Sequence, residues 1–467
     1  MEEKLQIIQL EIEKDRISSL PEQAINKILV RLSIKDAIRT SFLSRGWRYR
    51  WRSMPDLIFH SNSFSTPKDR KPSSLVRIYL SKVLQSLFLH KGNYIRRFEF
   101  SSRWKIISSK VDMWLDHLVC AGVQELKLAF TEEYYLIPSS VFRYDKLTTL
   151  DLKSCKIILP VSFNGFRNDF PITFDGFRNL TTLRLRSITF EKYNALETLI
   201  NLCPLLEILD VRNLLGYRQR LILHAPNLQS LTIDGSLSYL CFKETRTVTN
   251  AKLILNPNEF FYDLTNVLNS LSMVHQLKFW SSGHSLFKEV VSFPLTTENI
   301  KFNQLKKLFL GVNLDCSKET AIAFCILKNC PSLSHLQIYC EHLEEEEEEE
   351  EEDGISLEEE DGTSLEEEDG ISLSTSNEFW NDQRNFSSSS FDNLKVFDIT
   401  NVHGSKSELR FIKYILGKAP LLKVSNIKID WKTIAFGERK MGDILIQLLS
   451  FERISSAKVI IDEPGSN

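Results

Sequence analysis

LTTLDL at residues 147–152 decides the fold of this chain, because the same pattern returns as LTTLRL at residues 180–185 and as LEILDV at residues 206–211. Each copy is apolar at its first, fourth and sixth positions. Such a copy suits one strand, and the residues before the next copy suffice for a loop and a helical or irregular return. We therefore predict an α/β protein whose repeats bury their apolar faces by stacking in parallel.

The pattern can be followed along most of the chain. Its copies start at Ile95, Val123, Leu147, Leu180, Leu206, Leu228, Val248, Val274, Leu305, Leu333, Leu394 and Leu422. The starts lie 20 to 33 residues apart, except for one interval of 61 residues. Chance periodicity does not explain so many copies. They resemble leucine-rich repeats, which implies a solenoid with parallel strands on the concave face and helices or irregular segments on the convex face.

The composition fits a large folded chain, since 42% of the 467 residues are hydrophobic and 25% are charged. No run of about 18 apolar residues occurs, and the charged start MEEKLQIIQLEIEK lacks the apolar core of a signal peptide. We expect a soluble protein of the cytoplasm and/or the nucleus that does not bind a membrane.

The net charge of −3 hides a segregation of charge. Residues 344–373 hold 18 of the 61 acidic side chains and no Lys or Arg, so the rest of the chain has 58 basic against 43 acidic residues. Like-charge repulsion and scarce apolar residues predict that the acidic and Ser-rich insert at 343–390 is disordered. The positive charge elsewhere is dispersed among acids without a recognition motif, so we expect no nucleic-acid partner.

The sequence predicts no catalytic residue, no cofactor and no metal. It has no glycine-rich phosphate loop, HExxH or GxSxG motif. Cys325, Cys330 and Cys340 do not have the spacing of a structural zinc site, and the scattered cysteines are expected to be reduced and mostly buried. We therefore expect a protein that is not an enzyme.

Residues 15–59 read DRISSLPEQAINKILVRLSIKDAIRTSFLSRGWRYRWRSMPDLIF and predict three short helices. Pro21 suits the first turn of a helix, Ser33 caps a second helix over residues 34–42, and Ser44 caps a third that carries Trp47 and Trp51 on one face. Three helices in so few residues make little core, so this segment needs a partner surface.

This segment resembles an F-box, the motif that docks on a Skp-type adaptor in cullin-based ubiquitin ligases. The DRIS start and the LSRxWR ending are similar to those of the plant family in which an F-box precedes leucine-rich repeats and a C-terminal FBD segment, and the sequence from Phe391 resembles that segment. The residues that the resemblance assigns to adaptor binding are Leu20, Pro21, Ile25, Ile28, Leu29, Leu32, Ile38, Leu43, Trp47 and Trp51.

The segment departs from the family pattern at three positions. Gln23 stands where an acid is usual, Ser33 where a proline is usual, and Gly46 where a basic or polar residue is usual. Ser33 can cap the helix that proline normally opens. Gly46 inside a third helix is expected to cost about 1 kcal/mol relative to Ala and to weaken adaptor binding.

These signals predict the following organisation of the chain. We expect an N-terminal extension at 1–14, an F-box at 15–60, a linker with a first helical cap at 61–93, leucine-rich repeats at 94–342, the disordered insert at 343–390, and the last repeats with the FBD-like segment at 391–467.

The strand residues between the apolar positions provide candidate target-binding residues. The fourth position after successive starts gives Lys127, Asp151, Arg184 and Asp210, whose alternating signs predict cross-strand ion pairs. The sixth position gives Lys153, Arg186 and Arg212, a basic stripe that would receive an acidic or phosphorylated segment, although solvated surface charge also explains it. Later repeats place Trp280, Phe309 and Tyr339 on the same face, as an interface or under inserted loops.

The resemblance implies a substrate-recognition subunit of a Skp/cullin/F-box ubiquitin ligase. The F-box would bind the Skp-type adaptor, the adaptor would bring the cullin and the RING subunit, and the repeats would hold an unknown target protein for ubiquitination. Two alternatives remain open at the level of sequence, a ligand-sensing F-box receptor and a non-proteolytic F-box scaffold.

Overall fold

A computed structural model of the chain describes residue 17 and residues 19–63, 72–92, 94–104, 108–131, 135–159, 177–216, 219–235, 237–243, 245–255, 264–281, 301–342, 390–431 and 438–462. The N-terminal extension at 1–14 and the acidic insert up to residue 389 lie outside these residues. The chain forms two compact units. Unit 1 comprises Met1–Thr232 with Lys243–Thr245, and unit 2 comprises the remainder.

Unit 1 begins with the short helices that the sequence predicts. They are α2 (Glu22–Leu29), α3 (Ile34–Arg39) and the 3-10 helix η1 (Thr40–Phe42). Pro21 immediately precedes α2. The Asp36 backbone N–H donates to Ser33 Oγ at 3.2 Å, so Ser33 caps α3 as expected.

The expected third helix, from Ser44 to Trp51, is not an α-helix. Residues 45–49 form turns, and the 3-10 helix η2 (Arg50–Ser53) follows them. Backbone N–H groups along this stretch donate to carbonyls three residues earlier, as Trp47 does to Ser44. The predicted helix penalty at Gly46 was therefore wrong, because this glycine lies in the turns; Trp47 and Trp51 are nevertheless buried.

The parallel sheet of unit 1 follows directly. Its path is β1 (Asp56–His60), β2 (Arg97–Ser102), β3 (Glu125–Phe130), β5 (Thr149–Ile157), β6 (Thr182–Phe190) and β7 (Ile208–Arg212). The short strands β4 (Tyr135–Leu136) and β8 (Leu215–Gly216) pair with β5 and β6. The other elements up to the unit boundary are η3 (Ser61–Ser63), η4 (Ser139–Arg143), β9 (Gln219–His224) and β10 (Ser230–Gly235).

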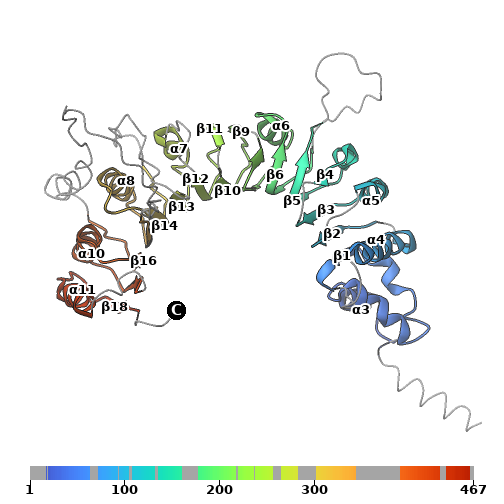
Figure 1. Cartoon of the computed structure of the whole chain (residues 1–467), viewed down its shortest axis with the longest axis horizontal. Coiled ribbons are helices and arrows are strands. Elements are labelled where there is room, and N and C mark those ends of the chain that lie inside the picture. Colours follow the sequence, from blue (N-terminus) through green and yellow to red (C-terminus); the bar gives the residue numbers. More distant parts are fainter. Residues whose placement is uncertain are drawn as a thin grey trace, which may run out of the picture. The chain divides into compact units, whose positions relative to one another are not determined.

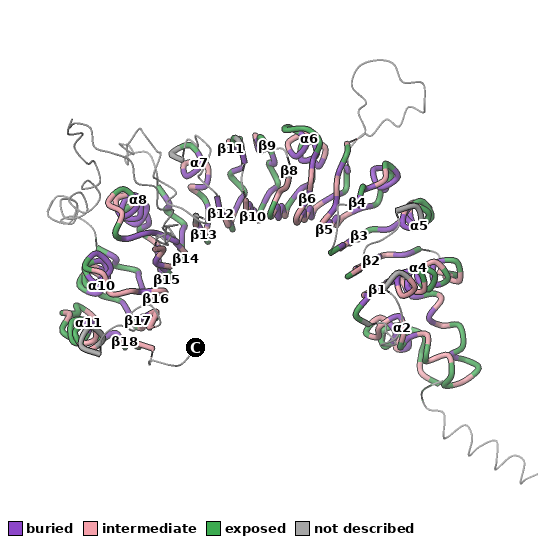
Figure 2. Tube along the Cα trace, in the orientation of Figure 1, coloured by how far each residue is buried: buried purple, intermediate pink, exposed green. Residues whose placement is uncertain are grey.

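The helices that connect the strands of unit 1 lie on one side of its sheet (Figure 1). They are α4 (Pro72–Leu89), α5 (Ser108–Cys120) and α6 (Ala195–Asn201). Phe98 and Phe100 of β2 point to this side, where the Phe100 ring lies 4.8 Å from the Trp114 ring of α5. Alternate strand residues are buried there (Figure 2), so the polar residues between them lie on the opposite face, which we call the polar face.

Unit 2 continues the same strand–helix alternation. Its elements are β11 (Leu237–Lys243), β12 (Asn250–Leu255), α7 (Leu264–Ser270), β13 (Gln276–Ser281), β14 (Lys307–Val312), α8 (Ser317–Lys328), β15 (His335–Cys340), β16 (Val396–Val402), α10 (Lys406–Lys418), β17 (Val424–Ile429), α11 (Glu438–Ser450) and β18 (Lys458–Ile461). Strands β12 to β18 pair in parallel in chain order. The predicted fold class, helices at the N-terminus followed by parallel α/β repeats, is confirmed.

The FBD-like segment is built into this sheet. β16 pairs with β15, and α10 begins with a capping box in which Ser405 and Glu408 satisfy each other's backbone N–H groups. Strands β16 and β17 of this segment each follow a further copy of the apolar pattern, at Leu394 and Leu422. Among the described helices of both units, none combines the length and the apolar character needed to cross a membrane.

Candidate functional site

The ten residues assigned to adaptor binding divide into three groups by exposure. Ile25, Leu29, Trp47 and Trp51 are buried, while Leu20, Leu32 and Ile38 are half-buried. Pro21, Ile28 and Leu43 are exposed. The buried group holds the helices together, so only the exposed residues and the accessible parts of the half-buried ones are available for contact with another protein.

Phe42 is the residue that sequence reasoning missed. Its side chain is 90% exposed, and the neighbouring Leu43 is 60% exposed. Exposed aromatic and aliphatic residues side by side are typical of the anchors of an interface. No local sequence signal marks Phe42, because an apolar residue at the end of the short helix η1 can be buried or exposed, depending on how the short helices pack.

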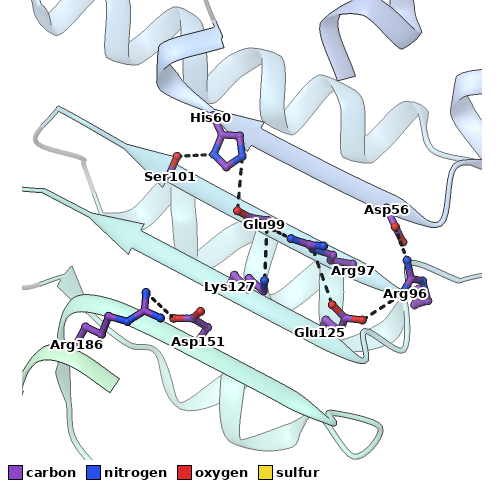
Figure 3. A network of polar contacts seen from close by, with 10 residues as sticks. All are labelled: Asp56, His60, Arg96, Arg97, Glu99, Ser101, Glu125, Lys127, Asp151 and Arg186. Atoms are coloured by element: carbon purple, nitrogen blue, oxygen red, sulfur yellow. Dashed lines mark hydrogen bonds and ion pairs between the residues drawn. The ribbon is translucent and has the colours of Figure 1, made fainter. Parts of the chain in front are cut away.

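The N-terminal helices are joined tightly to the sheet of unit 1. The carbonyl of Pro55, which follows η2, accepts hydrogen bonds from the backbone N–H groups of Arg96 and Arg97 at 2.7 and 3.1 Å. The Arg96 guanidinium bridges Asp56 of β1 and Glu125 of β3 (Figure 3). These contacts fix the end of the N-terminal segment relative to the first repeats.

The polar face over β2 and β3 carries a mosaic of opposite charges. Glu99 lies between Arg97, Lys127 and the His60 imidazole, whose Nε2 is 3.5 Å from its carboxylate (Figure 3). His60 Nδ1 is also 2.8 Å from Ser101 Oγ. This part of the face is internally neutralised and has a structural role.

The residues predicted at the fourth position of each copy lie opposite one another on neighbouring strands, and their charges alternate in sign. Lys127 of β3 lies opposite Asp151 of β5, and Arg184 of β6 lies between Asp151 and Asp210 in the strand register. Asp151 and Asp210 form ion pairs with Arg186, a sixth-position residue, at 3.9 and 3.8 Å. Burial raises the pKa of Asp151, and the cations Arg186, Arg184 and Lys127 oppose that rise.

The predicted cations at the sixth position form a row. Lys153 of β5 lies opposite Arg186 of β6, which lies opposite Arg212 of β7. Arg212 donates two hydrogen bonds to the Asp210 carboxylate, at 2.6 and 3.1 Å. The repulsion expected between neighbouring cations is thus relieved by carboxylates on the same face.

The predicted aromatic residues of unit 2 contact one another. The Trp280 ring of β13 lies 5.6 Å from the Phe309 ring of β14 and 4.9 Å from the Tyr339 ring of β15. Trp280 reaches Tyr339 across the intervening strand because Gly311 has no side chain there; a Cβ at this glycine would lie 2.7 Å from Trp280 Cδ1. All three rings are half-buried, so part of each remains accessible.

Glu341 lies beside this aromatic cluster. Burial raises the pKa of its carboxyl to about 8, the negative charge of Glu319 adds to the rise, and hydrogen bonding to Trp280 opposes it. Glu341 is therefore largely protonated at neutral pH. The cluster consequently presents aromatic surface beside a carboxyl group that carries little charge.

Among the residues that the structure describes, no group of three or more His, Cys, Asp or Glu side chains is arranged to hold a metal ion. All eight cysteines are free of disulfide bonds. Burial raises the pKa of the thiols of Cys203 and Cys325 to about 12 and about 11. Thiols with such pKa values are poor nucleophiles at neutral pH.

Comparison with known proteins identifies three regions of the chain. Residues 17–59 match the family model of the F-box domain, and residues 392–427 match the FBD model. Residues 111–256 match the model described as the LRR repeats of FBD-associated F-box protein At5g56370. Proteins with an F-box and such repeats are generally non-catalytic adaptors.

The chain is also similar over almost its whole length to curated proteins of Arabidopsis thaliana. It is 29% identical to F-box/FBD/LRR-repeat protein At1g13570 over 460 residues, which cover 94% of this chain and 96% of that protein. It is 26% identical to FBD-associated F-box protein At5g38590, over 93% of this chain and 98% of that protein.

Proposed function

We propose that this chain, whose segments match the F-box, LRR and FBD models, is the substrate-recognition subunit of a Skp/cullin/F-box ubiquitin ligase. The observation that carries this proposal is the division of the F-box residues. Buried residues such as Ile25 hold α2 in place, while Ile28 and Leu43 present apolar surface that a partner would cover.

In this proposal the chain performs no chemistry and acts by positioning. The F-box binds a Skp-type adaptor, which brings a cullin and a RING subunit, and the polar faces of the repeats hold the target protein. The hydrogen bonds from Arg96 and Arg97 to Pro55 support it, because they tie the F-box to the sheet and so hold a bound target at a defined place relative to the adaptor.

The repeats offer two candidate target surfaces, one in each unit. The first is the row Lys153, Arg186 and Arg212 of unit 1. The second is the aromatic cluster Trp280, Phe309 and Tyr339 of unit 2. Partly exposed Arg, Trp and Tyr residues are the types that dominate the energetics of protein interfaces.

The test is co-purification of the full chain with a Skp-type adaptor, a cullin and a RING subunit. The comparison is between the wild type and a variant carrying Leu20→Ala and Pro21→Ala. We expect the wild type to retain all three proteins and the variant to lose them together. Adaptor retained without cullin would instead indicate a non-proteolytic scaffold, and a wild type that retains no adaptor would reject the proposal.

A further inference from the structure

Strands β5 and β6 of unit 1 carry the same arrangement at their middle, and β7 carries it at its end: a cation followed by a small polar residue. The three pairs are Lys153 with Ser154, Arg186 with Ser187, and Arg212 with Asn213. None of these residues is buried, although strict alternation would turn every second side chain into the core. We call these six residues the cation–hydroxyamide strip.

The backbone explains why both residues of each pair stay outside. Ser154, Ser187 and Asn213 have φ angles of +55°, +53° and +50°, the left-handed region that non-glycine residues rarely adopt. This conformation interrupts the alternation, and the buried pair Cys155 and Ile188 then restores the register. A left-handed serine costs about 1 kcal/mol or more, whereas asparagine adopts this region readily, so the costly conformation lies at Ser154 and Ser187, beside Lys153 and Arg186.

The strip combines two kinds of hydrogen-bond donor. Guanidinium and ammonium groups supply charge, and serine hydroxyls and an asparagine amide supply short neutral donors. The side chains are close enough to act together, since Asn213 Nδ2 donates to Ser187 Oγ at 3.1 Å. Adjacent strands lie about 4.8 Å apart, so one tetrahedral anion can reach donors from two strands.

Arg186 at the centre is available to an incoming anion. Its guanidinium lies 3.9 Å from Asp151 and 3.8 Å from Asp210, beyond the range of a direct hydrogen bond. The Arg186 side chain is 38% exposed, whereas those of Asp151 and Asp210 are only 15% and 10% exposed. The carboxylates thus lie beneath the cations, and Arg186 can turn its donors outward.

The charge of this part of the face matches one phosphate monoester. Lys156 of β5 forms an ion pair with Glu191 at 2.9 Å and adds no net charge. The other cations across β5 to β7 are Lys153, Arg184, Arg186 and Arg212, and the acids are Asp151 and Asp210, a surplus of two positive charges. A phosphorylated serine or threonine carries about −1.5 to −2 charges at neutral pH. A nucleic acid fits less well, because its further phosphates would meet the acids of the mosaic around Glu99.

We propose that the cation–hydroxyamide strip binds a single phosphorylated serine or threonine in a target protein, with Arg186 as the central contact and Ser187 as a neutral donor. This inference rests on the proposed function, in which the repeats hold the target. It makes target capture by unit 1 dependent on phosphorylation.

The probe is a peptide library with one fixed phosphoserine and random flanking residues, compared with the same library unphosphorylated. The full chain, immobilised, is expected to retain the phosphorylated library at least about tenfold better. Arg186→Gln should remove most of this preference. Ser187→Gly should weaken it, because glycine keeps the positive φ and removes only the hydroxyl.

Lys127→Gln is the matched control, because it removes one positive charge from the polar face outside the strip. Its preference for phosphoserine should stay within about twofold of the wild type. Equal retention of the two libraries, or an unchanged preference in Arg186→Gln, would overturn the proposal. Retention of a random single-stranded RNA as strong as that of the phosphopeptides would also overturn it, in favour of a nucleic-acid site.

The adaptor co-purification is measured on the same preparations. Phosphopeptide binding without adaptor would reject the proposed function and leave the strip as a phosphate site. Adaptor binding without any phosphoserine preference would reject the strip alone.

Discussion

Ile28 of α2 lies one helical turn from Ile25, yet Ile25 is fully buried and Ile28 is 40% exposed. The same residue type on one short helix therefore serves two purposes, internal packing at Ile25 and surface at Ile28. Replacing each isoleucine by alanine in turn tests the two roles separately.

Ile25→Ala is expected to lower the free energy of unfolding of the N-terminal helices by about 2–5 kcal/mol, because it leaves a cavity in a small core. Ile28→Ala, the matched control, should change it by less than about 1 kcal/mol. Chemical denaturation followed by the fluorescence of the buried Trp47 and Trp51 measures both. Equal losses in the two variants would contradict the assigned burial.

Gly311→Ala is expected to displace the Trp280 ring from Tyr339. The added Cβ would lie 2.7 Å from Trp280 Cδ1 and 2.8 Å from Glu341 Oε1, too close for either to stay in place. We expect a loss of about 1–3 kcal/mol and a change in the near-ultraviolet circular dichroism of the aromatic cluster.

The control for this substitution is Gly417→Ala. Gly417 is in α10, and a Cβ there meets no described atom within 4 Å. Alanine should stabilise that helix by up to about 1 kcal/mol, because it has the higher helix propensity. A tolerated Gly311→Ala with an unchanged spectrum would refute the close approach of Trp280.

The pKa of Glu341 predicts a dependence of stability on pH. Its carboxyl has a pKa of about 8 in the folded chain against an ordinary value of 4.5. Between these values the folded state holds a proton that the unfolded state has released, so the free energy of unfolding falls as the pH rises from about 4.5 to about 8.

Glu341→Gln should reduce this decrease in the free energy of unfolding, because glutamine has nearly the same shape as glutamic acid and does not titrate. The measurement is denaturation of both proteins from pH 5 to pH 9, with the exposed Glu452→Gln as the control. Parallel curves for the wild type and Glu341→Gln would show that this carboxyl does not titrate as inferred.

Asp56 and Arg96 are expected to be energetically coupled, since Asp56 is buried and accepts a hydrogen bond from the Arg96 guanidinium. A double-mutant cycle with Asp56→Asn and Arg96→Gln should give a coupling free energy of about 1–3 kcal/mol. The exposed pair Arg143 and Asp116, 3.3 Å apart, should give less than about 1 kcal/mol in the same cycle. Coupling free energies of equal size in the two pairs would contradict the inference that the buried Asp56–Arg96 contact is the stronger one.

The repeats were predictable from the sequence because burial follows the apolar period directly. Even the two weakest copies form strands in register, β12 with Ala251 and β17 with Ser425, and both of these residues are buried as the pattern requires. The alternating charges at Lys127 and Asp151 were predictable for the same reason, since the apolar residues fix which side chains face outward.

Features that depend on contacts between distant residues were not predictable. The exposure of Phe42 depends on how the short helices pack, and the stretch around Gly46 forms turns where local signals favoured a helix. The left-handed conformation of Ser154 and Ser187 has no local signal, because serine does not favour it. The contact of Trp280 with Tyr339 requires the strand order that places Gly311 between them.

The most direct test of the account is the affinity of the full chain for a purified Skp-type adaptor, measured by titration for the wild type and for a variant with Phe42→Ala and Leu43→Ala. Leu421→Ala, an exposed leucine of unit 2, is the control. We predict that the wild type and the control bind alike and that the double variant binds at least about thirtyfold more weakly, as expected for the loss of an interface anchor. Unchanged affinity in the double variant, or no binding by the wild type, would contradict the account.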